Sequence, residues 1–594
     1  MSQQAQVPPQ SGPAEPTDAG LPSALPVTPP GASEATRLLC AGSYLDEAYR
    51  DAVIDELYVH EERIVAPSLG FDAARVLAHA LRARRLELGW AAGVLFLWIV
   101  GMVLSEYLLI VFLTPSLLLF LATKVRGPAE QPPVWRRFPA WWIKWYGRLM
   151  LLLALGSLIA VIAGEAEDLS VARFLADVLP EPIAQLVLAF ESGGPVEPFH
   201  AWVCLVTLLL VAACVAAQRG QFARALAGEL HPQKFGDIAA DPAERAENGR
   251  FQRLRRRIRT EQHAPLVMYH AARPFCGAGE PYDAWTLAVE LRPDPERTQL
   301  PIGNRMILEA VRPLLAELRV PAPHAAGTVR DRLRQLQIDE CVFLPVDGLP
   351  QRDLAPYDDQ AFRVHRAEAV EEGGETRRHF LRIRVGGWEE EVVTTVFVRV
   401  HTQGGMLMLE IAPHVLLPIR KDFENADRIA HQYRHNSLFG KAVWALARTP
   451  RSLVSALTTL GRGIAFSWRI LTGGYGAAMP DGPACSVREL GSDGESSLFQ
   501  DMDVRRYLKS VQDRVANGVR AALRDAGYRT DEFAQKIVNV SGGGTLIENA
   551  SGAFAVGDHN VITNQTVQPG SSGSRPGPGS PFTKSGGDSS GSER

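Results

Sequence analysis

Two histidines and an aspartate at helical spacing are the first residues that could bind a metal ion. Asp427, His431 and His435 recur every four residues, so on a helix their side chains would share one face. Carboxylate and imidazole groups at this spacing can chelate zinc. No Glu follows His431 to act as a general base, and a solvated polar helix face is the simpler interpretation. We therefore expect no metal site and no cofactor.

A glycine-rich turn at residues 273–280 (RPFCGAGE) could bind an anion. Gly277 and Gly279 can expose backbone N–H groups, and Arg273 would add a positive charge beside them. A Gly-x-Gly pair is also common in ordinary loops. The favoured prediction is a structural turn, with an anion site as the alternative.

Small residues in the first apolar stretch could bring helices into close contact. Gly89 and Gly93 form a GxxxG pair, and Gly101 lies two turns further along the same face. Small side chains at this spacing let two membrane helices approach closely. The pattern predicts helix packing at Gly89, Gly93 and Gly101, within the chain or between copies of it.

Common catalytic and metal-binding motifs are missing from the sequence. It contains no GxxxxGK[ST], HExxH or HxE…PCxxC pattern. The six cysteines form no CxxC pair, which disfavours a zinc site or a disulfide framework. With 62 Lys and Arg against 66 Asp and Glu, the net charge of −4 predicts no nucleic-acid partner. We expect no catalytic residues and no enzymatic activity.

Four apolar runs place these residues in a membrane protein. The runs cover residues 88–104, 107–123, 149–164 and 199–217, each about long enough to cross the ~30 Å hydrocarbon core of a bilayer. One helix over the first two runs would be too long, so Glu106 is expected at a turn between them. We predict an α-helical membrane domain over residues 88–217, in which four transmembrane helices form two hairpins in the lipid bilayer.

The charges between the runs predict their orientation. Basic residues end the helical segment expected at 37–87 and fill the stretch between the second and third runs. Residues 165–198 instead carry seven acids and one arginine. By the positive-inside rule this loop faces outward and both termini are cytoplasmic. The sequence therefore predicts a multi-pass protein of the cell inner membrane.

Alternating apolar residues after the last run indicate a sheet. Residues 218–262 are expected to form a basic helical linker, and residues 263–427 a cytosolic α+β domain. Candidate strands cover 266–270, 285–291, 341–346, 380–385, 391–401 and 406–415, and candidate helices cover 305–318 and 328–336. The pairs Gly386-Gly387 and Gly404-Gly405 are the expected turns of an antiparallel sheet.

A basic amphipathic region follows at residues 428–476. Residues 438–475 contain no acid and combine tryptophans with Lys and Arg, which is typical of a helix on an anionic membrane surface. We predict contact with anionic inner-leaflet lipids, and packing on the α+β domain is the alternative. Residues 477–535 should form a linker and an amphipathic helix that ends near Gly527.

The composition is unusual at both ends of the chain and in the segment that precedes the C-terminal tail. Residues 1–36 are rich in proline, and residues 568–594 in Gly, Ser and Pro, so disordered termini are expected. Residues 537–567 hold only two charged residues among valine, isoleucine, glycine and asparagine. This composition favours strands stacked between chains, and predicts a β segment over residues 536–567.

Residues 554–562 (FAVGDHNVI) resemble the core of the RIP homotypic interaction motif and the related bacterial amyloid signalling sequences. The matching positions are Val556, Gly557, Asn560 and Ile562. Ala555 stands where those sequences have glutamine. The resemblance implies self-association through the four matching residues, and hence a homo-oligomer. A small β-ribbon packed on the domain is the alternative.

The whole layout resembles a group of uncharacterised actinobacterial multi-pass membrane proteins. The shared features are a Pro-Phe-x-Gly-x-Gly segment at 274–279, a C-terminal helix, the junction at 530–533 and a glycine-rich valine segment. The resemblance implies location and architecture, but no activity.

These patterns favour a non-enzymatic scaffold or signalling component of the inner membrane that associates with copies of itself. One alternative is a channel or transporter subunit with rings of Glu106 at the mouth of a pore, although no ionisable residue lies deep in a run. The second is a membrane-anchored enzyme that uses the 263–427 domain, with His431 and His435 or the 273–280 turn.

Overall fold

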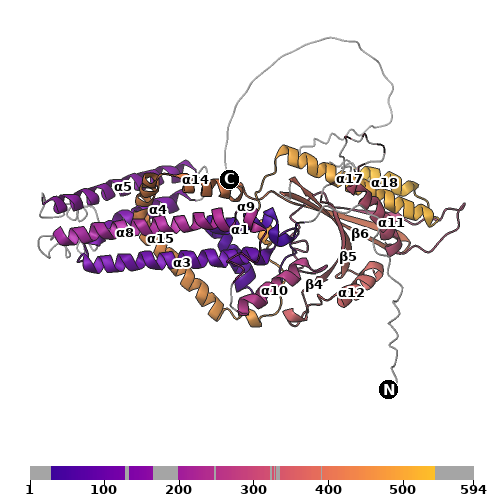
Figure 1. Ribbon diagram of the computed structural model, residues 1–594. Helices are drawn as coiled ribbons and strands as arrows, with labels where there is room; N and C mark the ends of the chain where they lie inside the picture. The colour runs from indigo at the N-terminus through magenta and orange to yellow at the C-terminus, as the bar shows by residue number, and fades with distance from the viewer. Residues whose placement is uncertain are drawn as a thin grey trace, which may run out of the picture. The chain divides into compact units, whose positions relative to one another are not determined.

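The structure is a computed structural model of the whole chain. It describes residues 28–127, 133–164, 198–245, 249–321, 335–372, 374–388 and 391–541, with isolated positions between 322 and 334. These residues form helices and one mixed sheet (Figure 1). Most of the acidic loop at 165–198, most of the helix expected at 328–336, and Val556, Gly557, Asn560 and Ile562 lie outside the described residues.

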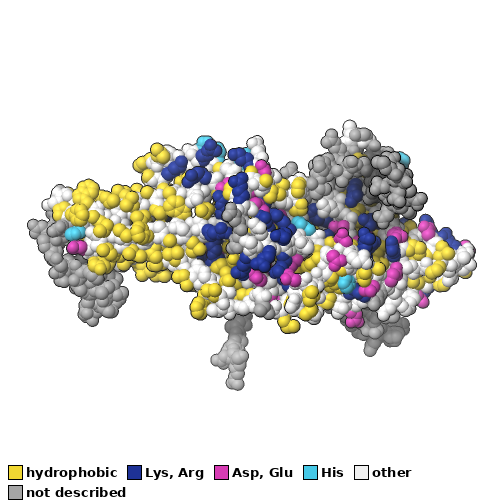
Figure 2. Space-filling model, turned by 60° about the horizontal axis from the view of Figure 1, so that its bottom comes forward, with side chains coloured by type: hydrophobic (Ala, Val, Ile, Leu, Met, Phe, Trp, Pro, Cys, Tyr) yellow, Lys and Arg dark blue, Asp and Glu magenta, His cyan; other side chains and the backbone are white. Residues whose placement is uncertain are grey.

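Among the described residues, four helices are long and apolar enough to cross a membrane, as the apolar runs predict. They are α3 (Ala73–Leu104), α4 (Leu113–Arg126) with the preceding turn η3 (Leu108–Phe112), α5 (Val134–Ala163) and α8 (Pro198–Arg224). Glu106 and Tyr107 have positive φ angles of 48° and 67°, so the chain reverses at the predicted turn. Exposed hydrophobic side chains cover these helices (Figure 2).

Two of these helices, α3 and α8, extend beyond the apolar runs into a second core, which we call the helical core. It gathers buried residues of α1 (Glu34–Leu45), α2 (Glu47–Ile54), the first part of α3, and α10 (Gly249–His263). Further along α3, Val94 and Trp98 are buried among the membrane helices instead. A π-turn at Ala225–Glu229 follows α8 and adds Leu226 to the helical core. One continuous α3 therefore belongs to both cores.

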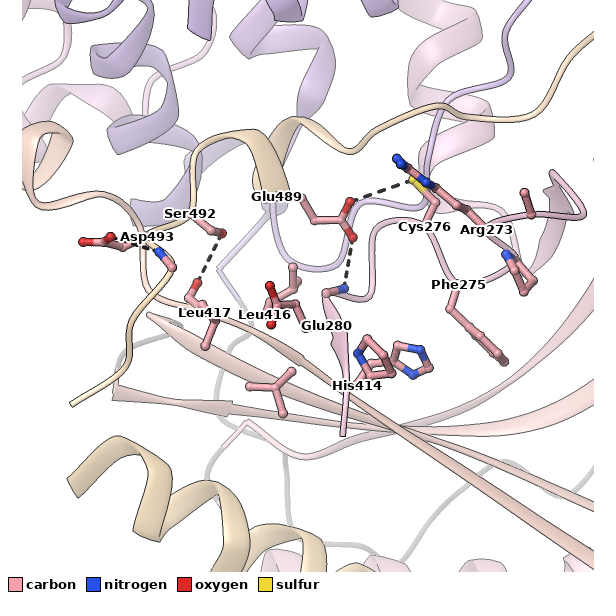
Figure 3. A pocket seen from close by; sticks show the side chains of 16 residues that line it. Arg273, Phe275, Cys276, Glu280, His414, Leu416, Leu417, Glu489, Ser492 and Asp493 are labelled. Atoms are coloured by element: carbon pink, nitrogen blue, oxygen red, sulfur yellow. Dashed lines mark hydrogen bonds between the residues drawn. The ribbon is translucent and has the colours of Figure 1, made fainter. Parts of the chain in front are cut away.

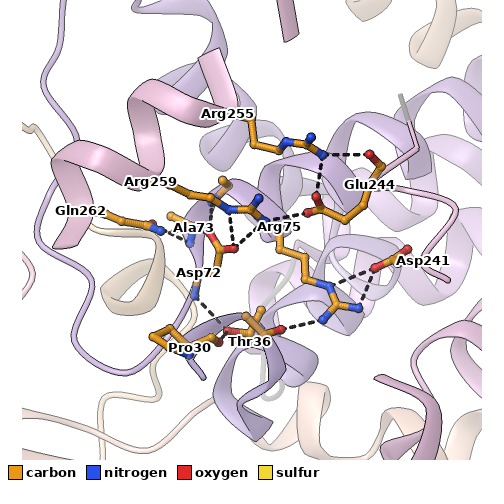
Figure 4. Close-up of polar contacts among 12 residues, drawn as sticks. Pro30, Thr36, Asp72, Ala73, Arg75, Asp241, Glu244, Arg255, Arg259 and Gln262 are labelled. Atoms are coloured by element: carbon orange, nitrogen blue, oxygen red, sulfur yellow. Dashed lines mark hydrogen bonds and ion pairs between the residues drawn. The ribbon is translucent and has the colours of Figure 1, made fainter. Parts of the chain in front are cut away.

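A buried ion pair holds α3 in the helical core (Figure 4). Arg75 is 1% exposed and donates two hydrogen bonds to Oδ2 of Asp241, at 2.7 and 2.9 Å. It also donates to the carbonyl oxygens of Gly31 and Phe235, and His79 Nε2 lies 3.0 Å from the same carboxylate oxygen. Burial alone would raise the pKa of Asp241, but hydrogen bonds from His79, the backbone and Arg75 hold it well below its usual value.

A second set of polar contacts ties the start of α3 to α10 (Figure 4). Asp72 caps α3 and accepts hydrogen bonds from Arg259 at 2.9 Å and from Gln262 at 3.0 Å. Glu244 accepts from Arg255 and Arg259. Several basic side chains of the segment expected as a linker are therefore paired with acids, and the segment is part of the helical core.

The described residues form one seven-stranded mixed sheet. Its strands are β1 (Leu266–Tyr269), β2 (Glu280–Pro281), β3 (Trp285–Glu290), β4 (Gln337–Pro345), β5 (Arg378–Gly387), β6 (Val392–Gln403) and β7 (Met406–Leu416). The order is β1-β4-β5-β6-β7-β2, and β3 also pairs with β7. Strands β5, β6 and β7 form the predicted antiparallel meander.

The prediction of an antiparallel sheet is wrong for β1 and β4, which pair in parallel. Parallel neighbours need a long crossover connection, and the stretch between them, which contains α11 (Asn304–Ala316), provides one. Gly404 and Gly405 form the predicted turn with φ angles of 59° and 78°. The other turn comes later than predicted, at Trp388, because Gly386 and Gly387 still belong to β5.

Of the described helices, α11, α12 (Asp359–Glu372) and α17 (Leu498–Asp525) pack on the sheet, and α11 and α17 lie side by side (Figure 1). The end of α17 before Gly527, whose φ is 80°, agrees with the prediction. Ser497 and Gln500 form a capping box that begins this helix.

Buried contacts join the sheet to the helical core. Glu261 of α10 accepts hydrogen bonds from Arg352 at 2.8 and 2.5 Å, and both side chains are buried. The same carboxylate accepts from the backbone N–H of Val65. Arg384 of β5 donates to the carbonyl oxygen of Leu69 at 3.2 Å. The connection between α2 and α3 is therefore bonded to the sheet region.

The basic amphipathic region forms α14 (Ala426–His435) and the long helix α15 (Leu438–Thr472). The latter packs against α3, α4 and α8, and its residues Leu453 and Ala456 are buried among those helices. Other apolar side chains of α15 are exposed, including Ile464 and Trp468. The helix thus packs on the membrane helices, and its contact with lipids stays a prediction.

The two ends of the described chain differ from the predictions. The helix α18 (Asp531–Ser541) includes the first residues of the expected β segment, 536–541, which are helical. Acids occupy the first turn of α18 and Phe533 is buried, both of which favour this helix. At the other end, α1 begins at Glu34, inside the stretch expected to be disordered, because Ser33 caps it.

We predict that Asp241→Asn destabilises the protein strongly, because Arg75 would stay buried without a counter-charge. The expected cost is about 3–5 kcal/mol, measured as a lower Tm of the purified protein in detergent. Asp422→Asn, at a carboxylate that is 79% exposed, is the matched control and should leave the Tm unchanged.

The same pair predicts a pH dependence. Because the folded pKa of Asp241 is lowered, its contribution to stability is present above the unfolded value of 3.8 and is lost as the pH falls towards the folded value. The Tm difference between wild type and Asp241→Asn should shrink below about pH 3.8. Equal Tm values for the two proteins near neutral pH would contradict this account.

Candidate functional site

A pocket of about 710 Å³ lies beside the predicted glycine turn (Figure 3). One side is formed by residues 272–276 and 279–281, and the other by the end of β7 and the chain around α16 (Val487–Leu490). The polar or ionisable side chains in its lining are Arg273, Cys276, Glu280, His414, Glu489, Ser492 and Asp493. These residues come from segments far apart in the sequence.

The two glycines of the turn bind an anion, and that anion is a side chain of the same chain. The backbone N–H groups of Gly277 and Gly279 donate to Oε1 of Glu489, at 2.7 and 3.1 Å. Glu489 is labelled in Figure 3. Both glycines have positive φ angles, and a Cβ on Gly279 would lie 2.6 Å from the backbone nitrogen of Leu416. The turn is therefore structural, as the favoured prediction has it.

Glu489 also fixes the helix that carries it. Its Oε2 accepts from the backbone N–H of Ser486 and closes the capping box of α16. Arg273 points elsewhere and donates to the carbonyl oxygen of Ala484 at 2.8 Å. Burial and the nearby Glu489 carboxylate raise the pKa of the Cys276 thiol well above its usual value, so this thiol is a weak nucleophile.

His414 belongs to an aromatic cluster at the edge of the pocket. Its ring packs on Phe275 with 4.6 Å between centroids, and Phe275 also contacts Phe343, Phe380 and Phe397. Burial lowers the pKa of His414, and a contact of its Nδ1 with the carbonyl oxygen of Ala412 only partly opposes this shift. The imidazole is therefore neutral at physiological pH and serves mainly in packing.

Asp427, His431 and His435 lie on α14, but they do not form a metal site. Asp427 pairs with Arg37 at 3.0 Å. His431 and His435 are exposed and stack on each other, with 3.9 Å between ring centroids. In the part of the chain that the structure describes, no group of three His, Cys, Asp or Glu residues could hold a metal ion.

The three glycines of α3 have different surroundings. A Cβ on Gly101 would clash with the side chain of Thr207 on α8 and lie 2.9 Å from Leu109. Gly93 faces Cys214 at an ordinary distance of 3.9 Å, and Gly89 has no neighbour within 4 Å of that position. Of the three, Gly101 alone is required for a close helix approach, and that approach is within the chain.

Sequence reasoning missed a second cavity, of about 480 Å³, between α3, α4, α8 and α15. Arg219, Arg448 and Arg451 line it, together with Trp90 and Trp444. These residues come from three separate segments, so no linear motif joins them. The only feature of the sequence that pointed to this cavity was the absence of acidic residues from 438–475.

We predict that Glu489→Ala lowers the stability of the protein by about 1–3 kcal/mol, because the backbone N–H groups of Gly277, Gly279 and Ser486 lose their acceptor. Glu489→Gln keeps an oxygen that can accept both hydrogen bonds from the glycines and should cost less. The readout is the Tm in detergent, with the exposed Glu495→Ala as a control. A wild-type Tm for Glu489→Ala would refute the structural role of this carboxylate.

Gly101→Ala should also lower the Tm, because its methyl group has no room against Thr207. Gly89→Ala is the matched control on the same helix, since its methyl group would meet open space. The account of the helix contact fails if the two variants unfold at the same temperature.

Comparison with known proteins gives one match. Residues 284–557 match the family model described as the AbeC-like domain, a little under half of the chain. The match begins beside β3, includes α15 and α17, and runs past the described residues to Gly557. It excludes the four membrane helices and the glycine turn. No curated protein and no solved structure matches the chain. Residues 284–557 are therefore similar to AbeC-like domains, whose description names no activity.

Proposed function

We propose that this protein is a non-enzymatic scaffold or signalling component of the inner membrane, which holds its sheet at the cytoplasmic face and associates with further copies of itself. The observation that carries the proposal is the continuity of α3 and α8 from the membrane helices into the helical core. Anchoring of this kind is what a membrane-bound platform requires.

Polar contacts join α3 to α8 and to the turn that follows it. Arg82 pairs with Glu229 of the π-turn, and Trp90 Nε1 donates to Gln221 Oε1 of α8 at 2.7 Å. The sheet is in turn bonded to the helical core through Glu261 and Arg352. A flexible tether would let the sheet move freely, whereas these contacts support a fixed position near the bilayer.

The potentially reactive side chains contact other parts of the same chain, which supports a non-enzymatic role. Enzymes bring groups with shifted pKa values to an open cavity, where they can reach a substrate. Here Glu489 is bonded to the glycine turn, Asp427 to Arg37, and His414 packs among aromatic rings. The side chains that suggested chemistry in the sequence are therefore committed to the fold.

The distribution of charge supports the cytoplasmic placement of the sheet. Lys and Arg side chains gather beside the hydrophobic surface of the membrane helices (Figure 2). Arg126 is at the end of α4, and Arg219 and Arg224 are at the end of α8. Glu106 and His200, 3.8 Å apart, mark the opposite ends of α3 and α8. Basic residues favour the cytoplasmic side.

Self-association rests on the composition of residues 542–567, which follow α18, and on the resemblance carried by Val556, Gly557, Asn560 and Ile562. Stacked strands tolerate few charges, and this segment has two. The AbeC-like match extends to residue 557, so the beginning of the segment is part of the matched region rather than of the Gly/Ser-rich tail.

Subunit counting of the full-length protein in isolated native membranes tests this proposal. We expect oligomers for the wild type and a shift to monomers for Ile562→Asp, because a charge at an apolar position would repeat in every chain of the stack. Thr583→Asp adds the same charge in the tail and should keep the oligomers. A monomeric wild type, or an unchanged Ile562→Asp, would overturn self-association.

A further inference from the structure

The cavity between α3, α4, α8 and α15 lies where three apolar runs end on the same side. Trp90 and Val94 line it from the beginning of the run in α3, and Val215 from the end of the run in α8. This part of the lining is apolar and continues into the membrane helices. The lining also includes Gln218, Arg219 and Arg448, so the cavity combines apolar and polar side chains at the ends of the apolar runs.

Three arginines give this cavity an excess of positive charge. Of the described residues, no Asp or Glu pairs with Arg219, Arg448 or Arg451. The Nε of Arg451 is buried without a hydrogen-bond partner. The one acid in the lining is Glu87, and its carboxylate is paired with Arg50.

Other arginines of α15 form ion pairs with acids, unlike the arginines that line the cavity. Arg462 pairs with Glu47 and Arg469 with Asp55, so both fix the end of α15 to the helical core. Arg448 and Arg451 lie on the same helix without such partners. A guanidinium held half-buried beside like charges is costly unless an anion neutralises it.

The electrostatics of the cluster agree with this picture. Burial, followed by the charges of Arg219 and Arg451, lowers the pKa of Arg448. Burial and the nearby Arg148 lower the pKa of Arg451. An anion between these groups would therefore be bound by several positive charges at once.

Tryptophans favour a lipid as the source of that anion. The Trp444 ring lies 5.6 Å from the Arg219 guanidinium and 4.3 Å from that of Arg448. Trp90 is held by its hydrogen bond to Gln221. Tryptophan is enriched at the level of lipid headgroups, and the planar guanidinium matches two phosphate oxygens at once. The volume of about 480 Å³ is within the range of small-ligand sites.

We propose that this cavity binds the phosphate of an anionic phospholipid from the cytoplasmic leaflet, through Arg219, Arg448 and Arg451. The lipid chains then follow the apolar part of the lining along α3 and α8. Basic pockets between membrane helices on the cytoplasmic side are suited to anionic headgroups. The inference rests on the membrane placement in the proposed function, but it does not require self-association.

The test uses purified full-length protein in a neutral detergent. The Tm is measured with added phosphatidylglycerol, phosphatidylcholine or inorganic phosphate. Phosphatidylglycerol should raise the Tm of the wild type more than phosphatidylcholine does, and inorganic phosphate should not replace it. Arg448→Gln/Arg451→Gln should abolish the phosphatidylglycerol-specific rise, with an apparent affinity at least about tenfold lower.

Two control pairs separate lost binding from lost folding. Arg428→Gln/Arg434→Gln changes the net charge equally at exposed positions of α14 and should respond like the wild type. Without anionic lipid, the cavity variant should be at least as stable as the wild type, because like charges have been removed. Arg448→Lys/Arg451→Lys keeps the charge without the planar fork, and should show a reduced but measurable rise.

Three outcomes would overturn the inference. They are an equal rise with phosphatidylcholine, an equal response of the two Gln double variants, and full replacement of the lipid by inorganic phosphate, which would mean a site for a free anion. The Ile562→Asp variant should keep the phosphatidylglycerol response. A failure of self-association would thus leave this result intact, and a failure here would leave self-association standing.

Discussion

The buried contact between Arg75 and Asp241 fixes the helix on which the other parts of the structure depend. It holds the beginning of α3 in the helical core, while the rest of the same helix carries the first apolar run. Because a continuous helix resists bending, the position of the membrane helices determines where the helical core lies. The sheet follows through Glu261 and Arg352. The helix α3, held by this ion pair, thus joins the hydrophobic and the polar parts of the chain.

Whether charges are paired within the chain also distinguishes the two candidate sites. At the glycine turn, the anion that the backbone N–H groups attract is supplied by Glu489, so the turn stabilises the fold. At the end of the membrane helices, Arg219, Arg448 and Arg451 have no such internal acid among the described residues. The first arrangement favours a structural role and the second favours a partner from outside the chain. The unpaired arginines, more than the absence of a catalytic motif, therefore indicate binding of a ligand at the end of the membrane helices.

Predictions from sequence succeeded where the signal was local. Four apolar runs, the turn at Gly404-Gly405 and the helix end before Gly527 each depend on neighbouring residues. The partner of Gly277 is 212 positions away, and β1 finds its parallel neighbour only after a long crossover, so neither was visible. Asp427 had the correct spacing for a metal ligand, but Arg37, 390 positions away, binds it instead. The arginine cavity was missed for the same reason, since α8 and α15 meet only in the folded chain.

If α3 passes from a protein core into lipid as one helix, its surroundings change near residue 88 without a break in the helix. A scan of single spin labels along residues 76–104, in a cysteine-free background reconstituted into bilayers, can show this. We expect one unbroken helical period of about 3.6 residues, with oxygen access rising and access of a water-soluble relaxation agent falling beyond residue 88. A break in the period near residues 83–88, or access of the water-soluble agent throughout 88–104, would contradict the account.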